Sequence, residues 1–368
     1  MPRTNERIQQ MLKEPIDPVY RELAEKLKEP KEEIFPRLLG KLMTLEEAKV
    51  MNALPASSED IARKLNLDKA TVEKDLNVLF EKGLLYPGRS GWHLIRSYGA
   101  LRDAAGASNP KYINDDFVDL TFAYSDEKNN KTIEDIRKGV LKSVRLSMRV
   151  VPRWKSIKDI PGLLPYEDVR EIYKGREPIV VVPCACKVVD RNRKCKDDVP
   201  VDSCVVVGKA AQYNLNRGTG KRITYDEALE LLEKFDKLSL VHLVGNSTTM
   251  PNMVCNCHNC CCGVFYRTSK LKPQVNQIAM AKSRFIATVD PAKCRSCKKC
   301  VAMCPIGAAQ IKYYAEFGGE RAYIDSEECI GCGLCVVSCT AQTRAMKMVR
   351  PPAHIPAPDA GAIADAAE

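Results

Sequence analysis

The sequence contains no long apolar run. Its 368 residues are 45% hydrophobic and 28% charged, an ordinary composition that excludes collagen-like and wholly disordered chains. The longest aliphatic stretches, such as 179–182 and 204–207, are far shorter than the roughly 20 residues that a membrane-spanning helix needs. The N-terminal MPRTNERIQQ also lacks the apolar segment of a secretory signal. We therefore expect a soluble, cytoplasmic protein.

Motifs of several enzyme classes are also missing. The sequence has no Gly-x-Gly-x-x-Gly dinucleotide fingerprint, and residues 218–221 lack the Walker spacing that binds nucleotide phosphates. No Ser-His-Asp set, carboxylate pair or His-Glu-x-x-His motif stands out. We therefore predict no flavin or nicotinamide site and no catalytic residue. Gly218-Thr-Gly220 is interpreted as a loop before a helix, and His242, on a predicted strand at 238–244, as a core histidine.

The 17 cysteines are confined to part of the chain. None precedes Cys184 and none follows Cys339. Thiols stay reduced in the cytosol, where clustered cysteines usually bind metal. The net charge is +10, and residues 181–293 supply 17 Lys/Arg against 10 Asp/Glu, a local excess of +7. We interpret this excess as compensation for metal–thiolate anions rather than as a nucleic-acid surface.

The most specific motif is a Cys-x2-Cys-x2-Cys-x3-Cys run that occurs twice, at 294–304 and 329–339. This spacing is typical of bacterial two-cluster ferredoxins, in which the fourth cysteine of each run binds the other cluster. Two [4Fe–4S] clusters are therefore predicted, and a pair of zinc knuckles is disfavoured. The predicted ligands are Cys294, Cys297, Cys300 and Cys339 for cluster one, and Cys329, Cys332, Cys335 and Cys304 for cluster two. Gly331 and Gly333 are expected to let the backbone turn around the sulfurs.

A second group of nine cysteines is also predicted to bind metal. Its members are Cys184, Cys186, Cys195, Cys204, Cys255, Cys257, Cys260, Cys261 and Cys262. His258 lies inside the last run and is either a ligand or occupies a position that holds none. The spacing does not show how these cysteines group. Two further iron–sulfur clusters, one cluster, and one cluster with a zinc ion all remain open, and zinc is less favoured because zinc ribbons use Cys-x2–4-Cys pairs.

The sequence pattern predicts an α+β protein with several domains. The expected segments are N-terminal helices with a winged-helix-like domain (1–95), a connecting region (96–175), a cysteine-rich α/β iron–sulfur domain (176–285), a ferredoxin-like module (286–350) and a disordered Pro/Ala-rich tail (351–368).

Local signals place the main elements within these segments. Capping boxes open helices at 44–47 and 224–227. Further helices are expected from Ser57 and Asp68, the second ending at Gly83, and another over 132–148. Strands are expected at 179–182 and 238–244, and hairpins at 84–95 and within 311–324.

The winged-helix-like segment carries little positive charge. The expected recognition helix has Lys69 and Lys74 against Glu73 and Asp75, and the turn at 87–91 adds only Arg89. DNA binding depends on a basic surface that neutralises phosphates. We therefore predict that this domain docks a protein partner rather than DNA.

These features resemble a family of 4Fe–4S dicluster proteins of anaerobes. The shared motifs, in chain order, are Leu164-Pro165-Tyr166-Glu167, Pro183-Cys184-Ala185-Cys186, Gly218-Thr-Gly220-Lys-Arg-Ile223, Leu240-Val241-His242, the run at 255–262 and the terminal ferredoxin motif. The similarity covers most of residues 42–345. It implies a winged-helix-like domain and electron transfer beside larger redox enzymes. The family run tends toward Cys-Asn-Cys-Cys, whereas His258 takes the fourth place here, and a histidine ligand would raise a cluster's potential.

The sequence therefore predicts an iron–sulfur electron-transfer protein. It would pass single electrons through two ferredoxin clusters, and through further clusters in the middle domain, to or from a larger low-potential redox enzyme or another electron-transfer subunit. A non-catalytic subunit is favoured over an enzyme. The alternative is a redox-sensing winged-helix transcription regulator, and a third hypothesis is reduction of a small substrate at an open iron within 184–262.

Overall fold

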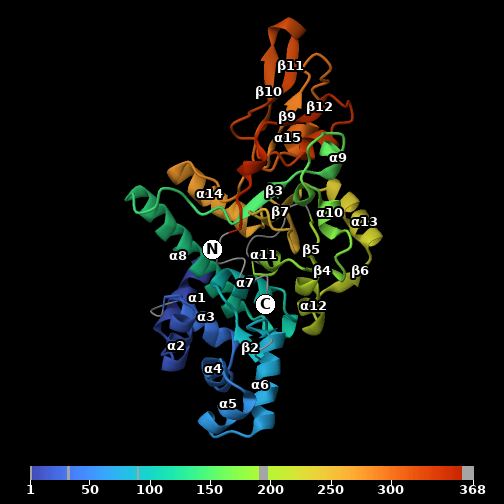
Figure 1. Ribbon diagram of the computed structural model, residues 1–368. Helices are drawn as coiled ribbons and strands as arrows, with labels where there is room; N and C mark the ends of the chain where they lie inside the picture. The colour runs from blue at the N-terminus through green and yellow to red at the C-terminus, as the bar shows by residue number, and fades with distance from the viewer. Residues whose placement is uncertain (1, 31–33, 89–90, 190–197, 359–368) are drawn as a thin grey trace.

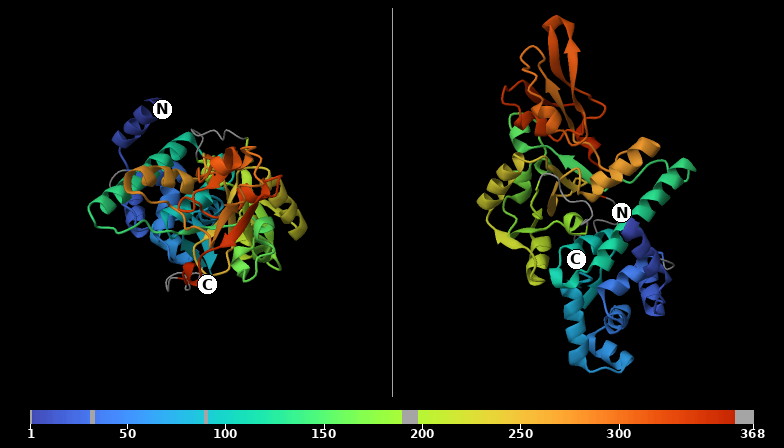
Figure 2. Two further views of the ribbon diagram at one scale, coloured as in Figure 1. Left: turned by 90° about the horizontal axis from the view of Figure 1, so that it is seen from above. Right: turned by 180° about the vertical axis from the view of Figure 1, so that it is seen from behind.

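The computed structural model describes residues 2–30, 34–88, 91–189 and 198–358. Figure 1 shows N-terminal helices at one end of an elongated molecule, a sheet in the centre and a small β-rich module at the other end. The view from behind shows the same order (Figure 2, right). Within the described ranges, none of the helices combines the length and the apolar character that crossing a bilayer requires.

The N-terminal part is a helical bundle with one hairpin. Its elements are α1 (Pro2–Lys13), α2 (Pro18–Lys26), α3 (Ile34–Leu42), α4 (Leu45–Asn52), α5 (Ser58–Leu65), α6 (Lys69–Glu81), β1 (Leu85–Gly88), β2 (Gly91–Leu94), α7 (Tyr98–Gly106) and α8 (Asp115–Arg137). The predicted capping box opens α4, because Thr44 Oγ1 accepts from Glu47 N at 3.2 Å and Glu47 Oε2 accepts from Thr44 N at 2.8 Å. Ser57 and Asp68 cap α5 and α6, as the sequence predicts.

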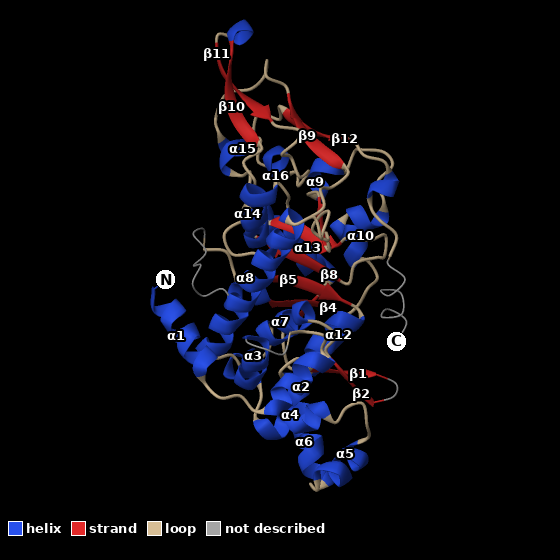
Figure 3. Ribbon diagram, turned by 90° about the vertical axis from the view of Figure 1, so that its left-hand side faces the viewer, coloured by secondary structure: helices blue, strands red, loops and turns tan. Residues whose placement is uncertain are grey.

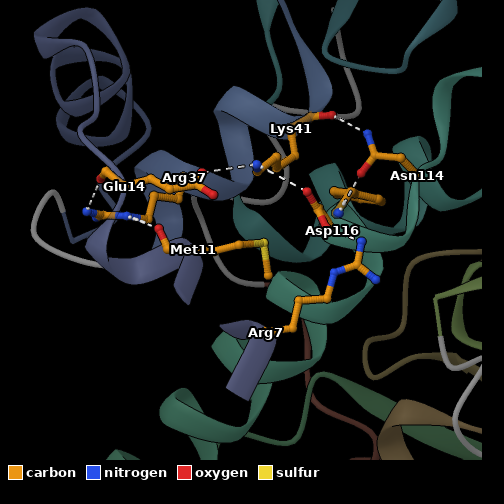
Figure 4. Close-up of polar contacts among 8 residues, drawn as sticks. Arg7, Met11, Glu14, Arg37, Lys41, Asn114 and Asp116 are labelled. Carbon is orange, nitrogen blue, oxygen red and sulfur yellow. Dashed lines mark hydrogen bonds and ion pairs between the residues drawn. The ribbon is translucent and has the colours of Figure 1, made fainter. Parts of the chain in front are cut away.

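Polar contacts fasten the first helices of this bundle to α8 (Figure 4). Arg37 on α3 donates to the carbonyl oxygens of Met11 and Glu14, each at 2.9 Å. Lys41 on the same helix pairs with Asp116 at 3.1 Å, and its own carbonyl accepts from Asn114 at 2.8 Å. These bonds satisfy carbonyl groups at the end of α1 and orient α3 between α1 and α8.

The helices and the hairpin of the winged-helix-like segment form where the sequence predicts them. Their assignment as a winged helix, and the docking role, stay predictions, and Arg89 lies outside the described residues. Lys69, at the start of α6, forms ion pairs with Glu59 and, at 3.6 Å, with Glu73. Phosphate contact by Lys69 would have to compete with these carboxylates.

The helix predicted over 132–148 is wrong in its position. Helix α8 begins at Asp115 and ends at Arg137, and Gly139 follows with a φ of +73°. Residue Met148 instead begins β3 (Met148–Val151), an edge strand of the central sheet. The segment 96–175 is therefore more than a connector, since it contributes a strand and the short helices α9 (Trp154–Ile157) and α10 (Val169–Tyr173).

The central sheet has six strands in the order β3-β7-β8-β5-β4-β6, and every neighbouring pair is antiparallel. Figure 3 shows these strands in the middle of the molecule with helices around them. The remaining elements are β4 (Ile179–Pro183), α11 (Ala185–Val188), β5 (Asp202–Val207), α12 (Lys209–Asn216), β6 (Lys221–Ile223), α13 (Tyr225–Asp236), β7 (Val241–Gly245), β8 (Met253–Cys257) and α14 (Gly263–Val275). The predicted strands at 179–182 and 238–244 and the capped helix from Thr224 are present.

The C-terminal module consists of two antiparallel pairs and two short helices. Strand β9 (Phe285–Val289) pairs with β12 (Arg344–Met348), and β10 (Ala309–Tyr314) pairs with β11 (Gly319–Ile324), which is the predicted hairpin. The helices are α15 (Lys299–Ala302) and α16 (Leu334–Val337). A buried ion pair fixes this module to the middle domain, because Arg284 Nε and a terminal nitrogen of Arg284 bond the two carboxylate oxygens of Glu167 at 2.8 and 2.7 Å. The Leu-Pro-Tyr-Glu motif thereby has a structural role.

The sequence predicts a disordered tail at 351–368, and the structure corrects this prediction for residues 351–358. Ile355 is buried, and Pro356 O accepts a hydrogen bond from Thr248 N at 2.9 Å. The segment therefore packs back onto the middle domain. Residues 359–368 lie outside the described residues.

Candidate metal centres

The two cysteine runs of the C-terminal module adopt matching backbone conformations. In the second run, Gly331 and Gly333 have φ values of +73° and +75°, as their predicted role requires. Ser296 and Lys298 occupy the same two places in the first run and also have positive φ, at 53° and 60°. Each run therefore curls in the same way before a four-residue helix. Only the second run uses glycine, because its loop packs against Ser283 and the backbone of β9, where a side chain would collide.

The second run and Cys304 line a common cavity. The lining of this cavity includes Cys304, Cys329, Cys332, Cys335, Ile306, Ala308, Ile324 and Leu334. Cys304 comes from the first run, so the structure brings together the four cysteines predicted for cluster two. Burial raises the pKa of the Cys335 thiol to about 12. The Cys335 thiolate would therefore need a bound cation to become stable in this apolar setting.

The first run lies nearer to solvent. Cys297 is exposed, whereas Cys300 is buried and shares a cluster of buried residues with Cys329 and Cys335. The Cys294 sulfur accepts a hydrogen bond from Ala322 N at 3.3 Å. Cys339 lies within 3.4 Å of the Thr343 hydroxyl, and bonds to this thiol hold its pKa below the ordinary value despite burial. Backbone and hydroxyl donors to these sulfurs are the interactions that tune cluster potentials.

Comparison with known proteins gives one match. The family model described as a 4Fe–4S dicluster domain matches residues 293–343, which include all eight cysteines of the two runs. Residues 293–343 are thus similar to 4Fe–4S dicluster domains and form a ferredoxin-like iron–sulfur region, which we call the dicluster domain. Searches of curated proteins and of solved structures find no significant match. The match therefore supports iron–sulfur binding by residues 293–343 and does not extend to the rest of the chain.

Six of the described cysteines outside the dicluster domain gather at one edge of the central sheet. Strand β4 runs toward Cys184, β5 begins two residues before Cys204, and β8 ends at Cys257. Because β4–β5 and β5–β8 are antiparallel, these three strand ends lie at the same edge. The turn after β8 then places Cys262 at the start of α14. On β8 itself, Cys255 and Cys257 are two residues apart and face the same side.

Six of these cysteines form a closed ring of neighbouring thiols, which we call the six-thiol ring. Each sulfur interacts with the next in the order Cys184, Cys186, Cys262, Cys257, Cys255, Cys204 and back to Cys184. Four of the six, at 184, 204, 257 and 262, are less than 9% exposed. Six thiols exceed the four ligands of one cubane and fall short of the eight that two separate cubanes need.

Hydrogen bonds between neighbouring thiols lower the pKa of two ring cysteines, Cys255 and Cys186. Hydrogen bonds from Cys204 and Cys257 lower the pKa of Cys255 to about 7, and bonds from Cys184 and Cys262 lower that of Cys186. The guanidinium of Arg102, on α7, also favours the Cys186 thiolate. Gly263 leaves room for this approach, since a Cβ there would lie 3.3 Å from Arg102 and 3.4 Å from the Cys186 sulfur. The ring is therefore suited to bind a cationic group through thiolates.

Cys260 and Cys261, two further predicted ligands of the middle domain, lie with His258 between β8 and α14. His258, Cys260 and Cys261 place their donor atoms within 4.8 Å of one another. Cys195 lies outside the described residues. Of the nine cysteines that the sequence treats as one group, eight are described: six form the ring, and Cys260 and Cys261 lie with His258 on the turn that follows β8.

A buried polar network runs between the dicluster domain and the ring. The backbone N–H of Arg153 donates to the Cys332 carbonyl at 3.0 Å, and the Arg153 guanidinium donates to His242 Nε2 at 2.8 Å. His242 Nδ1 therefore carries the proton and donates to Asn256 Oδ1 at 2.6 Å. Asn256 lies between Cys255 and Cys257 in the chain, and its amide donates to Ser203 O at 2.7 Å. His242 is a satisfied core histidine, as predicted, and burial keeps its pKa well below the usual value.

Sequence reasoning missed two residues of this region. Arg153 lies in the segment treated as a connector, where no motif marks it. Tyr173, on α10, is fully buried, and its hydroxyl has no hydrogen-bond partner within the described ranges. Burial raises the pKa of Tyr173, as does the thiolate charge of Cys204 and Cys255. A buried tyrosine hydroxyl usually has a partner, so this donor is available to a group bound in the ring.

Proposed function

We propose that this protein transfers single electrons between its dicluster domain and one further iron–sulfur centre held by the six-thiol ring. The observation that carries the proposal is the ring itself, a closed set of buried thiols at the edge of the sheet. Cysteine thiolates are the usual ligands of iron–sulfur clusters. In the dicluster domain, the proposed ligands are those that the sequence predicts, with Cys339 completing cluster one and Cys304 completing cluster two.

The proposed path leads from the surface to the interior. Cluster one would lie beside the exposed Cys297, and clusters one and two would share the buried residues around Cys300, Cys329 and Cys335. Cys332 then packs against the same apolar cluster as Cys257 and Cys262 of the ring. Apolar contact of this kind favours close spacing of the centres and excludes water between them. When bound, the clusters supply the one-electron chemistry, and the protein holds, spaces and shields them.

The proposed partner is a larger redox enzyme or another electron-transfer subunit. It would dock at the first cysteine loop, where Arg295, Lys298 and Lys299 surround Cys297 on an exposed surface. An acidic docking face would complement these side chains and speed the encounter at low ionic strength. The observations favour electron transfer over transcription regulation. Lys69, at the start of α6, is already paired with the carboxylates of Glu59 and Glu73, with which DNA phosphates would have to compete.

Metal content tests the proposal. Anaerobically purified protein is expected to contain about 12 iron and 12 sulfide ions per chain, of which the dicluster domain accounts for about eight. The variants Cys204→Ser and Cys257→Ser should each lower iron and sulfide to about eight, because their sulfurs belong to the ring alone. The measurement is iron and acid-labile sulfide analysis with EPR after dithionite reduction.

The matched comparison is Cys297→Ser, which removes a predicted ligand from the dicluster domain. It should lower the iron and sulfide contents of the protein. The EPR signal that is lost in Cys204→Ser and Cys257→Ser should persist. Wild-type protein with only about eight irons, and no change on substituting Cys204, would contradict a third centre.

Substitution of Tyr173 by Phe should lower the reduction potential of the ring centre. A hydroxyl that donates to a cluster sulfur favours the reduced, more negative state, so its removal should shift the potential by roughly −50 mV, equivalent to about 1.2 kcal/mol for one electron. Potentiometric EPR titration measures the shift. Tyr213→Phe is the control, because the Tyr213 hydroxyl donates to Leu85 O at 3.1 Å, away from the ring. Equal reduction potentials in Tyr173→Phe and wild type would show that the Tyr173 hydroxyl does not donate to a cluster sulfur.

A further inference from the structure

The turn between β8 and α14 carries three donor atoms besides the six thiols of the ring. The sulfurs of Cys260 and Cys261 and a ring nitrogen of His258 all lie within 4.8 Å of one another. His258 and Cys261 are each 2% exposed, and Cys260 is half-buried. Three soft or borderline ligands therefore converge in a sheltered position with no carboxylate in the group.

The backbone of the turn is closed by one hydrogen bond. Cys262 N donates to His258 O at 3.0 Å, which closes one turn of chain before α14 begins. Within this turn, Cys262 reaches the ring, where its sulfur meets Cys186 and Cys257. His258 Nδ1 instead lies 3.0 Å from the Cys260 sulfur. Cys260 therefore lies beside His258, and Cys262 lies beside Cys186 and Cys257.

We propose that His258, Cys260 and Cys261 bind a single zinc ion, separate from the iron–sulfur centre of the ring. Zinc–sulfur and zinc–nitrogen bonds of about 2.3 and 2.0–2.1 Å place neighbouring ligands of a tetrahedral ion less than about 4 Å apart. His258 Nδ1 and the Cys260 sulfur, at 3.0 Å, are already this close, and all three donors lie within 4.8 Å of one another, so a shift of roughly 1 Å would bring them to this arrangement. The thiolates of a cubane lie much farther apart, because four irons and four sulfides stand between them. A mixed sulfur and imidazole set without carboxylate also suits Zn²⁺ better than Mg²⁺ or Ca²⁺.

The location gives the ion a structural role. Asn259, inside the turn, donates to Pro305 O at 3.4 Å, and Pro305 follows Cys304 in the dicluster domain. The turn therefore lies between the proposed cluster two and the ring, and a zinc ion there would fix the position of Cys262. Structural zinc sites contribute directly to folding free energy.

Zinc analysis with matched variants tests the site on the full chain, purified anaerobically without an affinity tag. Wild-type protein is expected to retain about one zinc per chain. His258→Gln and Cys261→Ser should each lower zinc several-fold and leave iron and sulfide unchanged. Cys204→Ser should do the opposite, losing iron and keeping zinc. His93→Gln, which changes a histidine of the β2 strand, should alter neither metal.

Zinc K-edge absorption spectroscopy of the wild type provides a readout that needs no variant. A first shell with at least one imidazole and two or three sulfurs supports the proposal, whereas a shell of four sulfurs overturns it. Zinc that is absent from wild-type protein, or that survives both His258→Gln and Cys261→Ser, also overturns it. Iron loss in His258→Gln would show that these residues bind an iron–sulfur cluster instead. Because zinc and iron are measured separately, failure of this site is distinguishable from failure of the third iron–sulfur centre.

Discussion

Gly331→Ala should remove cluster two from the dicluster domain and lower iron by roughly four ions per chain. Gly331 has a φ of +73°, and a Cβ at this position would lie 2.1 Å from both Phe285 O and Ser283 Oγ. Phe285 belongs to β9, whose ladder with β12 holds that carbonyl in place. The loop would have to move away from β9, and Cys329 and Cys332 would move with it. We expect a loss of unfolding free energy of more than about 4 kcal/mol, the range of severe steric substitutions.

Gly307→Ala is the matched control in the same domain. Its φ is +76°, nearly that of Gly331, but no atom lies within 4 Å of the added Cβ. It should therefore cost only the intrinsic left-handed penalty of about 1–2 kcal/mol and leave the iron content unchanged. Iron and sulfide analysis and anaerobic guanidinium unfolding measure both variants. Equal losses in the two would show that backbone conformation, rather than the collision with β9, decides the outcome.

Local structure could be predicted because it depends on neighbouring residues. The capping boxes at Thr44 and Thr224, the hairpin at 84–95 and the cysteine runs of the dicluster domain all have signals within a few residues of each other. The helix placed at 132–148 failed for the same reason. Its apolar residues recur at helical spacing, and nothing nearby indicates that Met148 pairs with Gly245 of β7.

The grouping of the middle cysteines could not be predicted, because it depends on strand order. Cys184 and Cys204 meet Cys255 only because β5 lies between β4 and β8 in the sheet. Sequence distance gives no indication of this arrangement. The separation of Cys261 from Cys262 depends in turn on one closed turn of backbone. Residue type predicted metal binding, and only the topology divides the donors into sets.

The buried arginines are the features that the sequence conceals most completely. Arg153, Arg284 and Arg149 are each no more than 2% exposed, although arginine is ordinarily a surface residue. Each is buried where separate segments meet, and its partners are far away in the chain. Glu167, for example, is 117 positions from Arg284. A pattern based on local hydrophobicity assigns such residues to the surface.

Arg153→Met should destabilise the protein by about 3–5 kcal/mol, the cost of removing one partner of a buried ion pair. The Arg153 guanidinium bonds Asp236 at 3.0 Å, His242 at 2.8 Å and Phe235 O at 3.1 Å. Methionine fills a similar volume but donates to none of these groups. Asp236 would keep a largely buried charge, and His242 would lose the donor to its Nε2, each with a desolvation penalty.

Lys155→Met is the control, because Lys155 also pairs with Asp236, at 3.7 Å, but its side chain is 38% exposed. Exposed pairs contribute about 0–1 kcal/mol, so the loss should be small. Anaerobic chemical unfolding, followed separately by iron–sulfur absorbance and by circular dichroism, measures both variants. Arg153 also donates its backbone N–H to Cys332 O beside the proposed cluster two. The absorbance transition of Arg153→Met should therefore move to lower denaturant than that of Lys155→Met. If the two variants unfold together, the Arg153 network does not hold the dicluster domain to the sheet.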